Sequence, residues 1–103
     1  MIPVKAFAAQ SPTSPLAPFQ FERRELREQD VLIDILFSGV CHSDLHQARD
    51  EWGGSIYPMV PGHEIVGKVI KVGSGVTKFN LGDTAGVGVM VDSCRVCKPC
   101  QKH

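Results

Sequence analysis

The sequence predicts a mainly β fold, a barrel or sandwich of short strands with one short helix. Segments of alternating apolar and polar residues recur along the chain, and glycine and proline turns separate them. No helical pattern of about 10 to 15 residues alternates with these segments, as a doubly wound parallel sheet requires. With 103 residues, of which 43% are hydrophobic, the chain can build one small core, and we expect a single domain over residues 1–103.

Strands are expected, in chain order, over residues 1–8, 19–23, 31–37, 64–72 and 84–91. The third is the clearest, because its alternate residues are apolar and so share one face. These residues are Val31, Ile33, Ile35 and Phe37. A proline-rich loop over residues 11–18 separates the first two strands, and we expect the last strand to lead into a cysteine-rich loop that begins at Asp92.

The short helix is expected over residues 43–50. Ser43 is predicted as its N-cap, and Asp44 would lie in the first turn, where a carboxylate interacts favourably with the helix dipole. Gly53 and Gly54 end the helical pattern. Residues that precede proline avoid the helical region, so the segment 57–61 is expected to be extended.

Charge and cysteine content narrow the class of protein. Eleven lysine and arginine residues balance eleven aspartate and glutamate residues, so no overall field attracts nucleic acid or an anionic membrane, and neither is expected as a partner. No run of about eighteen apolar residues and no secretory signal is present. Four cysteines without an export signal indicate a reducing compartment, where thiols hold metal or do chemistry, and we expect a cytoplasmic protein.

Residues suited to metal binding and proton transfer are grouped next to two predicted strands. GVCHSDLH follows the third strand and holds a thiol, a hydroxyl, a carboxylate and an imidazole within six positions, and PGHE precedes the fourth strand. Taken singly, a cysteine is usually a small buried hydrophobe and a histidine an ordinary hydrogen-bonded residue. The grouping at strand ends, where ligands converge, favours a site.

A second group of candidate ligands consists of cysteines alone and forms the pattern CxxCxxC. Cys94, Cys97 and Cys100 lie in one loop that can wrap around a single ion. An iron–sulfur cluster is the weaker interpretation, because the bacterial pattern ends in Cys-Pro, whereas Pro99 precedes the third cysteine here. Three free surface thiols are the other alternative.

These motifs occur in the order found in a known family. GVCHSDLHQ, YPMVPGHEIVGKVIKVGSGV, GD and CxxCxxC resemble the medium-chain zinc-dependent alcohol dehydrogenases over nearly the whole chain. The resemblance is closest to the branch of cinnamyl alcohol dehydrogenases and broad-specificity, NADP-dependent aldehyde reductases. It implies a GroES-like β-barrel with a zinc loop, incomplete at its C-terminal end, and a nucleotide-binding domain outside these residues.

The resemblance also implies an activity. The parent enzyme would interconvert primary alcohols and aldehydes, with zinc and with NADP or NAD as cofactors, and would be a homo-oligomer acting on small molecules. A G-x-G-x-x-G turn after a strand is missing from these 103 residues, so we do not expect them to bind dinucleotide in the usual way. The chain alone is expected to be inactive.

By this resemblance, Cys41 and His63 are two of the three protein ligands of a catalytic zinc, and Glu64 is an occasional ligand or a carboxylate beside the metal. The third ligand, a cysteine, is expected beyond His103. Thiolate and imidazole suit zinc, and an open fourth position would bind the alcohol oxygen and lower its pKa.

Four neighbours of these ligands match family positions. Ser43 and His46 correspond to the hydroxyl and the outer imidazole of the proton relay, although Ser43 could be a simple helix cap. Asp44 corresponds to the carboxylate that orients the zinc-bound imidazole, its alternative being a solvated acid. His42 corresponds weakly to a residue that faces the cofactor pyrophosphate, and otherwise is just exposed.

Two aromatic residues and the cysteine loop complete the comparison. Trp52 and Tyr57 fall where relatives line the alcohol pocket, although Trp52 could instead cover the core. The cysteines of the CxxCxxC pattern match three of the four ligands of a structural zinc, and the fourth, a cysteine, is expected after His103. His103 could take the place of that cysteine, but poorly. GDTAGVG departs from the family, in which Arg-Val usually follows GD, so the packing of the last strand is expected to differ.

Two other hypotheses remain open at this point. The chain could be a non-catalytic GroES-like module that binds a partner, because a fold does not convey a function. Such a module has no need for Cys41, His63 or the CxxCxxC cysteines, so metal content would separate the two classes. The chain could also be a domain with no activity at all.

Overall fold

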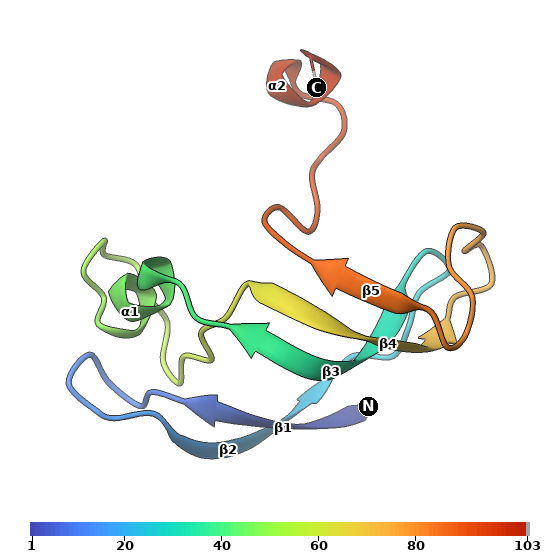
Figure 1. Ribbon diagram of the computed structural model, residues 1–103. Coiled ribbons are helices and arrows are strands. Elements are labelled where there is room, and N and C mark those ends of the chain that lie inside the picture. The colour runs from blue at the N-terminus through green and yellow to red at the C-terminus, as the bar shows by residue number, and fades with distance from the viewer. Residues whose placement is uncertain (103) are drawn as a thin grey trace.

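The computed structural model describes residues 1–102 and contains two antiparallel sheets and two short helices (Figure 1). The elements are β1 (Ile2–Ala8), β2 (Ala17–Arg23), β3 (Val31–Gly39), α1 (His42–Ala48), β4 (Glu64–Val72), β5 (Thr84–Val87) and α2 (Lys98–Lys102). One sheet pairs β1 with β2, and the other has the order β3-β4-β5. The mainly β expectation is confirmed, although over residues 1–102 the strands do not close into a barrel.

The first sheet is a regular hairpin, whose register runs from Ile2 opposite Arg23 to Ala8 opposite Ala17. Just after it, Ala9 and Met59 exchange backbone hydrogen bonds of 2.8 Å in both directions. This bridge ties the hairpin to the segment that leads into β4, and therefore to the start of the second sheet.

The buried core is small. Its apolar members are Ala8, Ala9, Val69 and Ala85. Large side chains of the second sheet remain in contact with solvent, with exposed fractions of 54% for Ile35 and 72% for Phe37. The face predicted from the alternation of β3 is therefore not a buried one over its second half. Register shifts between Leu32 and Ile33 and between Ile35 and Phe37 interrupt the regular pairing with β4.

Helix α1 begins earlier than predicted, and its N-cap is Cys41 rather than Ser43. Cys41 has extended backbone, with φ −119° and ψ 153°, and its N–H donates to the Asp44 carboxylate at 3.1 Å. Asp44 thus occupies the third helical position of a capping box and satisfies a backbone donor at the helix start. The expectation that Asp44 lies in the first turn is confirmed.

The end of the chain differs from expectation in two ways. Strand β5 ends at Val87 instead of residue 91. Val87 pairs with Ile65, the second residue of β4, so that strand has only Glu64 left to extend the pairing. The cysteine-rich segment contains a second helix, α2, where only one helix was expected. Pro99 lies in the first turn of α2, where its missing N–H costs nothing.

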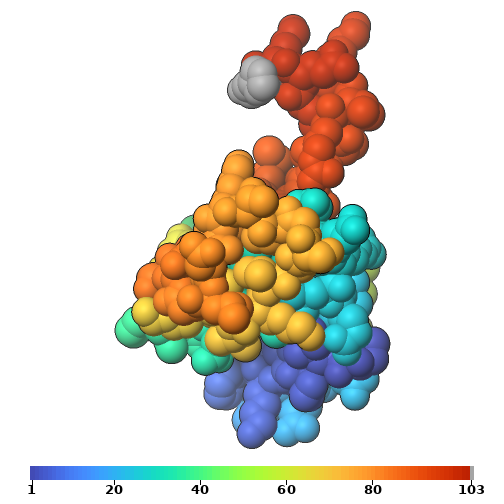
Figure 2. All heavy atoms as spheres, turned by 90° about the vertical axis from the view of Figure 1, so that its right-hand side faces the viewer, coloured from blue at the N-terminus to red at the C-terminus, as the bar shows by residue number. Residues whose placement is uncertain are grey.

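The segment after β5 leads away from the sheets and carries α2 at its end (Figures 1 and 2). The space-filling view shows this part of the chain, in red, standing apart from the rest of the molecule. Within residues 1–102 no helix is both long enough and apolar enough to span a membrane.

Candidate metal centres

The pairing of β3 with β4 brings the first group of candidate ligands together. Gly39, the last residue of β3, lies opposite Glu64, the first residue of β4. Cys41 follows the one strand and His63 precedes the other, so both reach the same end of the sheet. Ligand atoms of Cys41, His63 and Glu64 all lie within 4.8 Å of one another.

Asp44 connects the two sides of this cluster. Its Oδ1 atom accepts a hydrogen bond from Nδ1 of His63 at 2.9 Å, while its Oδ2 atom accepts the backbone N–H of Cys41 at 3.1 Å. With Nδ1 protonated, the lone pair of His63 lies on Nε2, the atom 3.9 Å from the Glu64 carboxylate. The carboxylate of Asp44 therefore sets the imidazole in the tautomer that a metal needs.

The same contacts shift two pKa values in opposite directions. The hydrogen bond to Asp44 is the main cause that raises the pKa of His63 above 6.5. Hydrogen bonds from the backbone and then the side chain of Ser43, with a smaller contribution from His63, lower the pKa of the Cys41 thiol. The capping role that competed with the relay role of Ser43 is filled by Cys41.

His46 lies one turn after His42 along α1 and packs among aromatic rings. Its ring centroid is 4.5 Å from that of His42 and 4.9 Å from that of Trp52. Its Nδ1 atom is buried and lies 3.5 Å from Oε2 of Glu51, with no hydrogen bond formed in the part of the chain that the structure describes. His46 therefore packs on His42 and Trp52, and it is not among the three groups whose ligand atoms lie together.

The second cluster lies at the start of α2. The sulfur atoms of Cys94 and Cys100 are 3.7 Å apart, and those of Cys97 and Cys100 are 3.2 Å apart. Tetrahedral zinc with Zn–S bonds of about 2.3 Å would place two sulfur atoms about 3.8 Å apart. The Cys94–Cys100 distance agrees with this value, whereas the Cys97–Cys100 distance is shorter. The three cysteines are free, and they form a group that could hold a metal ion. The expectation for His103 lies outside the described residues.

Hydrogen bonds within this cluster shift the pKa values of its three thiols. Backbone hydrogen bonds from Val96 and Cys97 lower the pKa of Cys94 to about 6. A hydrogen bond from the Cys97 side chain lowers the pKa of Cys100. For Cys97 a backbone hydrogen bond acts downward, but the thiols of Cys100 and Cys94 together raise its pKa. Cys97 thus keeps its proton to a higher pH than Cys94 and Cys100 do.

Comparisons with known proteins give the family. Residues 27–103 match the model described as the alcohol dehydrogenase GroES-like domain. The chain belongs to this family.

The chain is also similar to one part of several longer proteins. The chain is 56% identical over 96 residues to a probable cinnamyl alcohol dehydrogenase 8D of Oryza sativa subsp. japonica, covering 93% of this chain and 26% of that protein. It is 53% identical over 103 residues to a probable mannitol dehydrogenase of Medicago sativa, covering 98% of this chain and 29% of that protein. The chain thus spans little more than a quarter of the length of these curated relatives.

Solved structures agree with this assignment. The crystal structure of CAD from Helicobacter pylori, complexed with NADP(H), matches with a TM-score of 0.95 and 51% identity, over 99% of this chain and 29% of that one. A cinnamyl alcohol dehydrogenase from Sorghum bicolor matches with a TM-score of 0.93 and 50% identity, over 97% and 28%. The fold of this GroES-like domain is therefore shared with enzymes of that branch.

An open groove leads to the first cluster of the GroES-like domain. Its volume is about 750 Å³. The groove is lined by Phe37, Gly39, His63, Glu64, Ile65, Val66, Gly86, Val87, Gly88 and Val89. Apart from His63 and Glu64 at one end, these residues are apolar, so the groove suits the carbon skeleton of a small molecule.

The two aromatic residues expected in the pocket do not line this groove. Trp52 packs on His46 while 58% of it stays exposed. Tyr57 donates its hydroxyl to the backbone carbonyl of Ala48 at 2.7 Å and so supports the C-terminal end of α1. Burial, followed by the charge of Asp50, raises the pKa of Tyr57.

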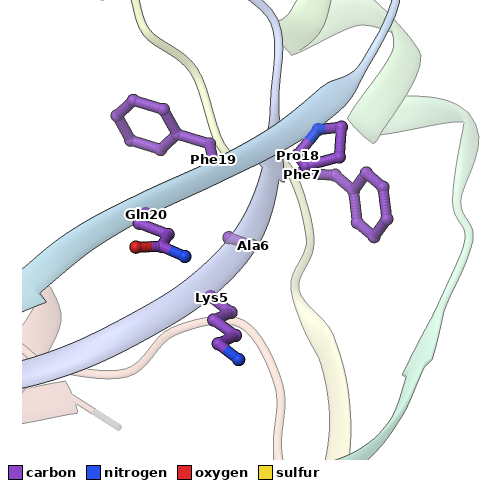
Figure 3. Close-up of a pocket in the computed structure, with 6 residues that line it drawn as sticks. All are labelled: Lys5, Ala6, Phe7, Pro18, Phe19 and Gln20. Atoms are coloured by element: carbon purple, nitrogen blue, oxygen red, sulfur yellow. The ribbon is translucent and has the colours of Figure 1, made fainter.

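A second hollow lies on the hairpin of β1 and β2 and has a volume of about 490 Å³ (Figure 3). Lys5, Ala6, Phe7, Pro18, Phe19 and Gln20 line it. It contains none of the candidate site residues, so we do not assign it to the metal site.

Sequence reasoning missed two glycines beside the first cluster. Gly62, directly before His63, has φ +135°, and a Cβ atom there would lie 3.3 Å from Oγ of Ser38. Gly39 lies against Glu64, its partner in the register of β3 and β4. The sequence signal was the position of each glycine one or two residues before a candidate ligand, which becomes informative once the register of β3 and β4 is known.

Proposed function

We propose that this chain is the zinc-carrying part of an alcohol dehydrogenase that interconverts primary alcohols and aldehydes with a nicotinamide cofactor. The observation that carries the proposal is the cluster of Cys41, His63 and Glu64 at the head of an apolar groove, oriented by Asp44. A third protein ligand, a cysteine, and the nicotinamide-binding domain belong to the proposal but lie outside residues 1–103. NADP is our preferred cofactor, because the CAD from Helicobacter pylori was crystallised with NADP(H).

Cys41 and His63 would hold the catalytic zinc, which when bound acts as a Lewis acid that lowers the pKa of an alcohol. Glu64 supplies a carboxylate within reach of the same position. The Ser43 hydroxyl, next to the Cys41 sulfur, would accept the substrate proton, and the imidazole of His46 would be the outer acceptor. His42 would face the cofactor phosphates.

The second cluster has a structural role in this proposal. Cys94, Cys97 and Cys100 would bind a zinc that holds the segment after β5 together, with a fourth ligand from outside the described residues. We further propose a cytoplasmic homo-oligomeric enzyme that acts on small alcohols and aldehydes.

Two substitutions in the full-length enzyme test the assignment. His63→Ala should remove both the catalytic zinc and alcohol oxidation, whereas Ser43→Ala should keep zinc and lose about 10²- to 10⁴-fold in rate. Zinc content and formation of reduced cofactor are measured together, with Lys5→Ala, in the hollow of Figure 3, as the control. Full zinc-dependent turnover by His63→Ala would refute the catalytic centre. Full turnover by Ser43→Ala would refute only the relay.

The chain of 103 residues by itself should not oxidise alcohols, because one thiolate, one imidazole and one carboxylate lack the third strong ligand and the cofactor domain. The test is to add NADP and an aromatic alcohol to the zinc-loaded chain and follow reduced cofactor. Total zinc alone is no test, because the thiol cluster can bind zinc too. Zinc-dependent turnover would show that the complete site lies within these residues.

A further inference from the structure

Gly39 lies directly against the carboxylate side chain of the first cluster. It is opposite Glu64 in the register of β3 and β4, so a side chain at position 39 would project on the same face as that of Glu64. A Cβ atom at Gly39 would lie 2.5 Å from Oε2 of Glu64 and 3.1 Å from its Cβ atom. The first of these separations is too short for any real contact, so a side chain here would displace the carboxylate.

Glycine is not needed at this position for its backbone freedom. The glycines with positive φ are Gly53, Gly54, Gly62 and Gly82, and Gly39 is an ordinary strand residue. Glycine within a strand usually weakens it, and it often marks a place where another group approaches closely. The group that approaches Gly39 is the side chain of Glu64.

The carboxylate of Glu64 has little else to define its position. Its polar contact among residues 1–102 is with Nε2 of His63 at 3.9 Å, and no hydrogen bond anchors it there. The side chain is 53% exposed. The space left by the missing side chain of Gly39 therefore decides that the carboxylate lies beside the ligand atoms of Cys41 and His63 rather than in solvent.

We propose that Gly39 is a positioning residue for the metal centre, which keeps the Glu64 carboxylate within reach of the metal bound by Cys41 and His63. This inference rests on the metal centre of the proposed function. The atom nearest to the added Cβ is the far end of a flexible side chain, and the Cβ atom of Glu64 at 3.1 Å has to give by only a few tenths of an ångström. Gly39→Ala should therefore move the carboxylate and leave the strand pairing intact.

Cobalt(II) is the probe, because thiolate-bound cobalt absorbs light in a way that reports its ligands. The full-length protein is titrated with Co²⁺, and the part of the spectrum that disappears in Cys41→Ser is assigned to this centre, which separates it from the cluster at Cys94. Gly39→Ala should weaken the Cys41-dependent binding by about 10- to 100-fold, the usual effect of disturbing groups around a ligand set, and should change the band shape.

Gly86→Ala is the matched control. Gly86 lines the same groove, but its added Cβ atom would meet its nearest neighbour, the backbone oxygen of Ile65, at an ordinary 3.5 Å. Its Co²⁺ affinity and spectrum should match those of the unmodified protein. Equal losses in Gly39→Ala and Gly86→Ala would overturn the inference, because any added methyl group would then suffice.

A double-mutant cycle tests whether Gly39 acts through Glu64. In a Glu64→Gly background both clashing atoms are gone, so adding Gly39→Ala should have no further effect on Co²⁺ binding. If Gly39→Ala alone fails to fold, folding and Cys41-dependent binding in the double variant support the inference, and their absence overturns it.

The outcomes separate the two proposals. If the unmodified protein shows no Cys41-dependent cobalt spectrum, the metal centre itself is wrong and the role of Gly39 falls with it. If that spectrum is present and Gly39→Ala leaves it unchanged, the centre stands and the inference about Gly39 is overturned.

Discussion

Oδ1 of Asp44 lies 2.9 Å from Nδ1 of His63, so the first turn of α1 holds the imidazole that precedes β4. The two residues are nineteen positions apart in the sequence. The same carboxylate accepts the N–H of Cys41, and one side chain thereby relates both strong ligands of the proposed centre.

Asp44→Asn should lower the pKa of His63 in the metal-free protein, because the hydrogen-bonded carboxylate is the main cause that raises it. A raised folded-state pKa stabilises the fold fully below the unfolded value of about 6.5, and the contribution is lost as pH rises through the folded pKa. The stability lost in Asp44→Asn should therefore be larger at about pH 5.5 than at about pH 9.

NMR titration of His63 and urea unfolding at the two pH values check this prediction. Zinc affinity should fall by about 10- to 100-fold as well. Asp34→Asn, at an exposed position of β3, is the control and should change neither quantity. An unchanged His63 pKa in Asp44→Asn would show that the carboxylate does not control this imidazole.

Gly62→Ala should destabilise the protein by about 1 to 3 kcal/mol, the usual cost of a backbone conformation that side chains rarely adopt. Gly62 has φ +135°, and its added Cβ atom would also press on Oγ of Ser38 at 3.3 Å. Urea unfolding measures the loss. Gly88→Ala is the comparison, because a Cβ atom there would meet nothing within 4 Å, and equal midpoints for the two variants would contradict the prediction.

Cys94 should react with iodoacetamide faster than Cys97 in the metal-free protein at neutral pH. Both thiols are exposed, so access does not separate them, but the pKa of Cys94 is about 6 whereas that of Cys97 is raised. Because the thiolate is the nucleophile, the alkylation rate of Cys94 should rise with pH through a midpoint near 6. Peptide mapping by mass spectrometry follows each site.

Zinc should protect all three thiols of this cluster from alkylation, and a chelator should restore the reaction. A faster reaction of Cys97 at neutral pH would contradict the prediction that Cys94 has the lower pKa.

Tyr57→Phe should destabilise the protein by about 1 kcal/mol, because it removes the hydrogen bond to the Ala48 carbonyl while keeping the ring. If Tyr57 supports α1 and does not touch the substrate through its hydroxyl, KM in the full-length enzyme should stay constant. Thermal unfolding and steady-state kinetics are measured on the same variant. A raised KM with unchanged stability would instead place the hydroxyl in the pocket.

The strands were largely predictable from local pattern, because alternation and turn residues act over a few positions. Strand β4 has the expected bounds, and β1 and β3 differ from expectation by one or two residues. The end of β5 was not predicted, because it depends on the pairing of Val87 with Ile65 near the start of β4. Helix α2 was not predicted either, since it is short and contains Pro99.

The residue types of the candidate site were also set by the sequence, because thiols, imidazoles and carboxylates at these spacings have few other uses. The tertiary structure decided how they are joined. Only the antiparallel register places Gly39 against Glu64, and only the approach of α1 to the start of β4 lets Asp44 reach His63. These contacts join residues far apart in the chain, so no local pattern could have specified them.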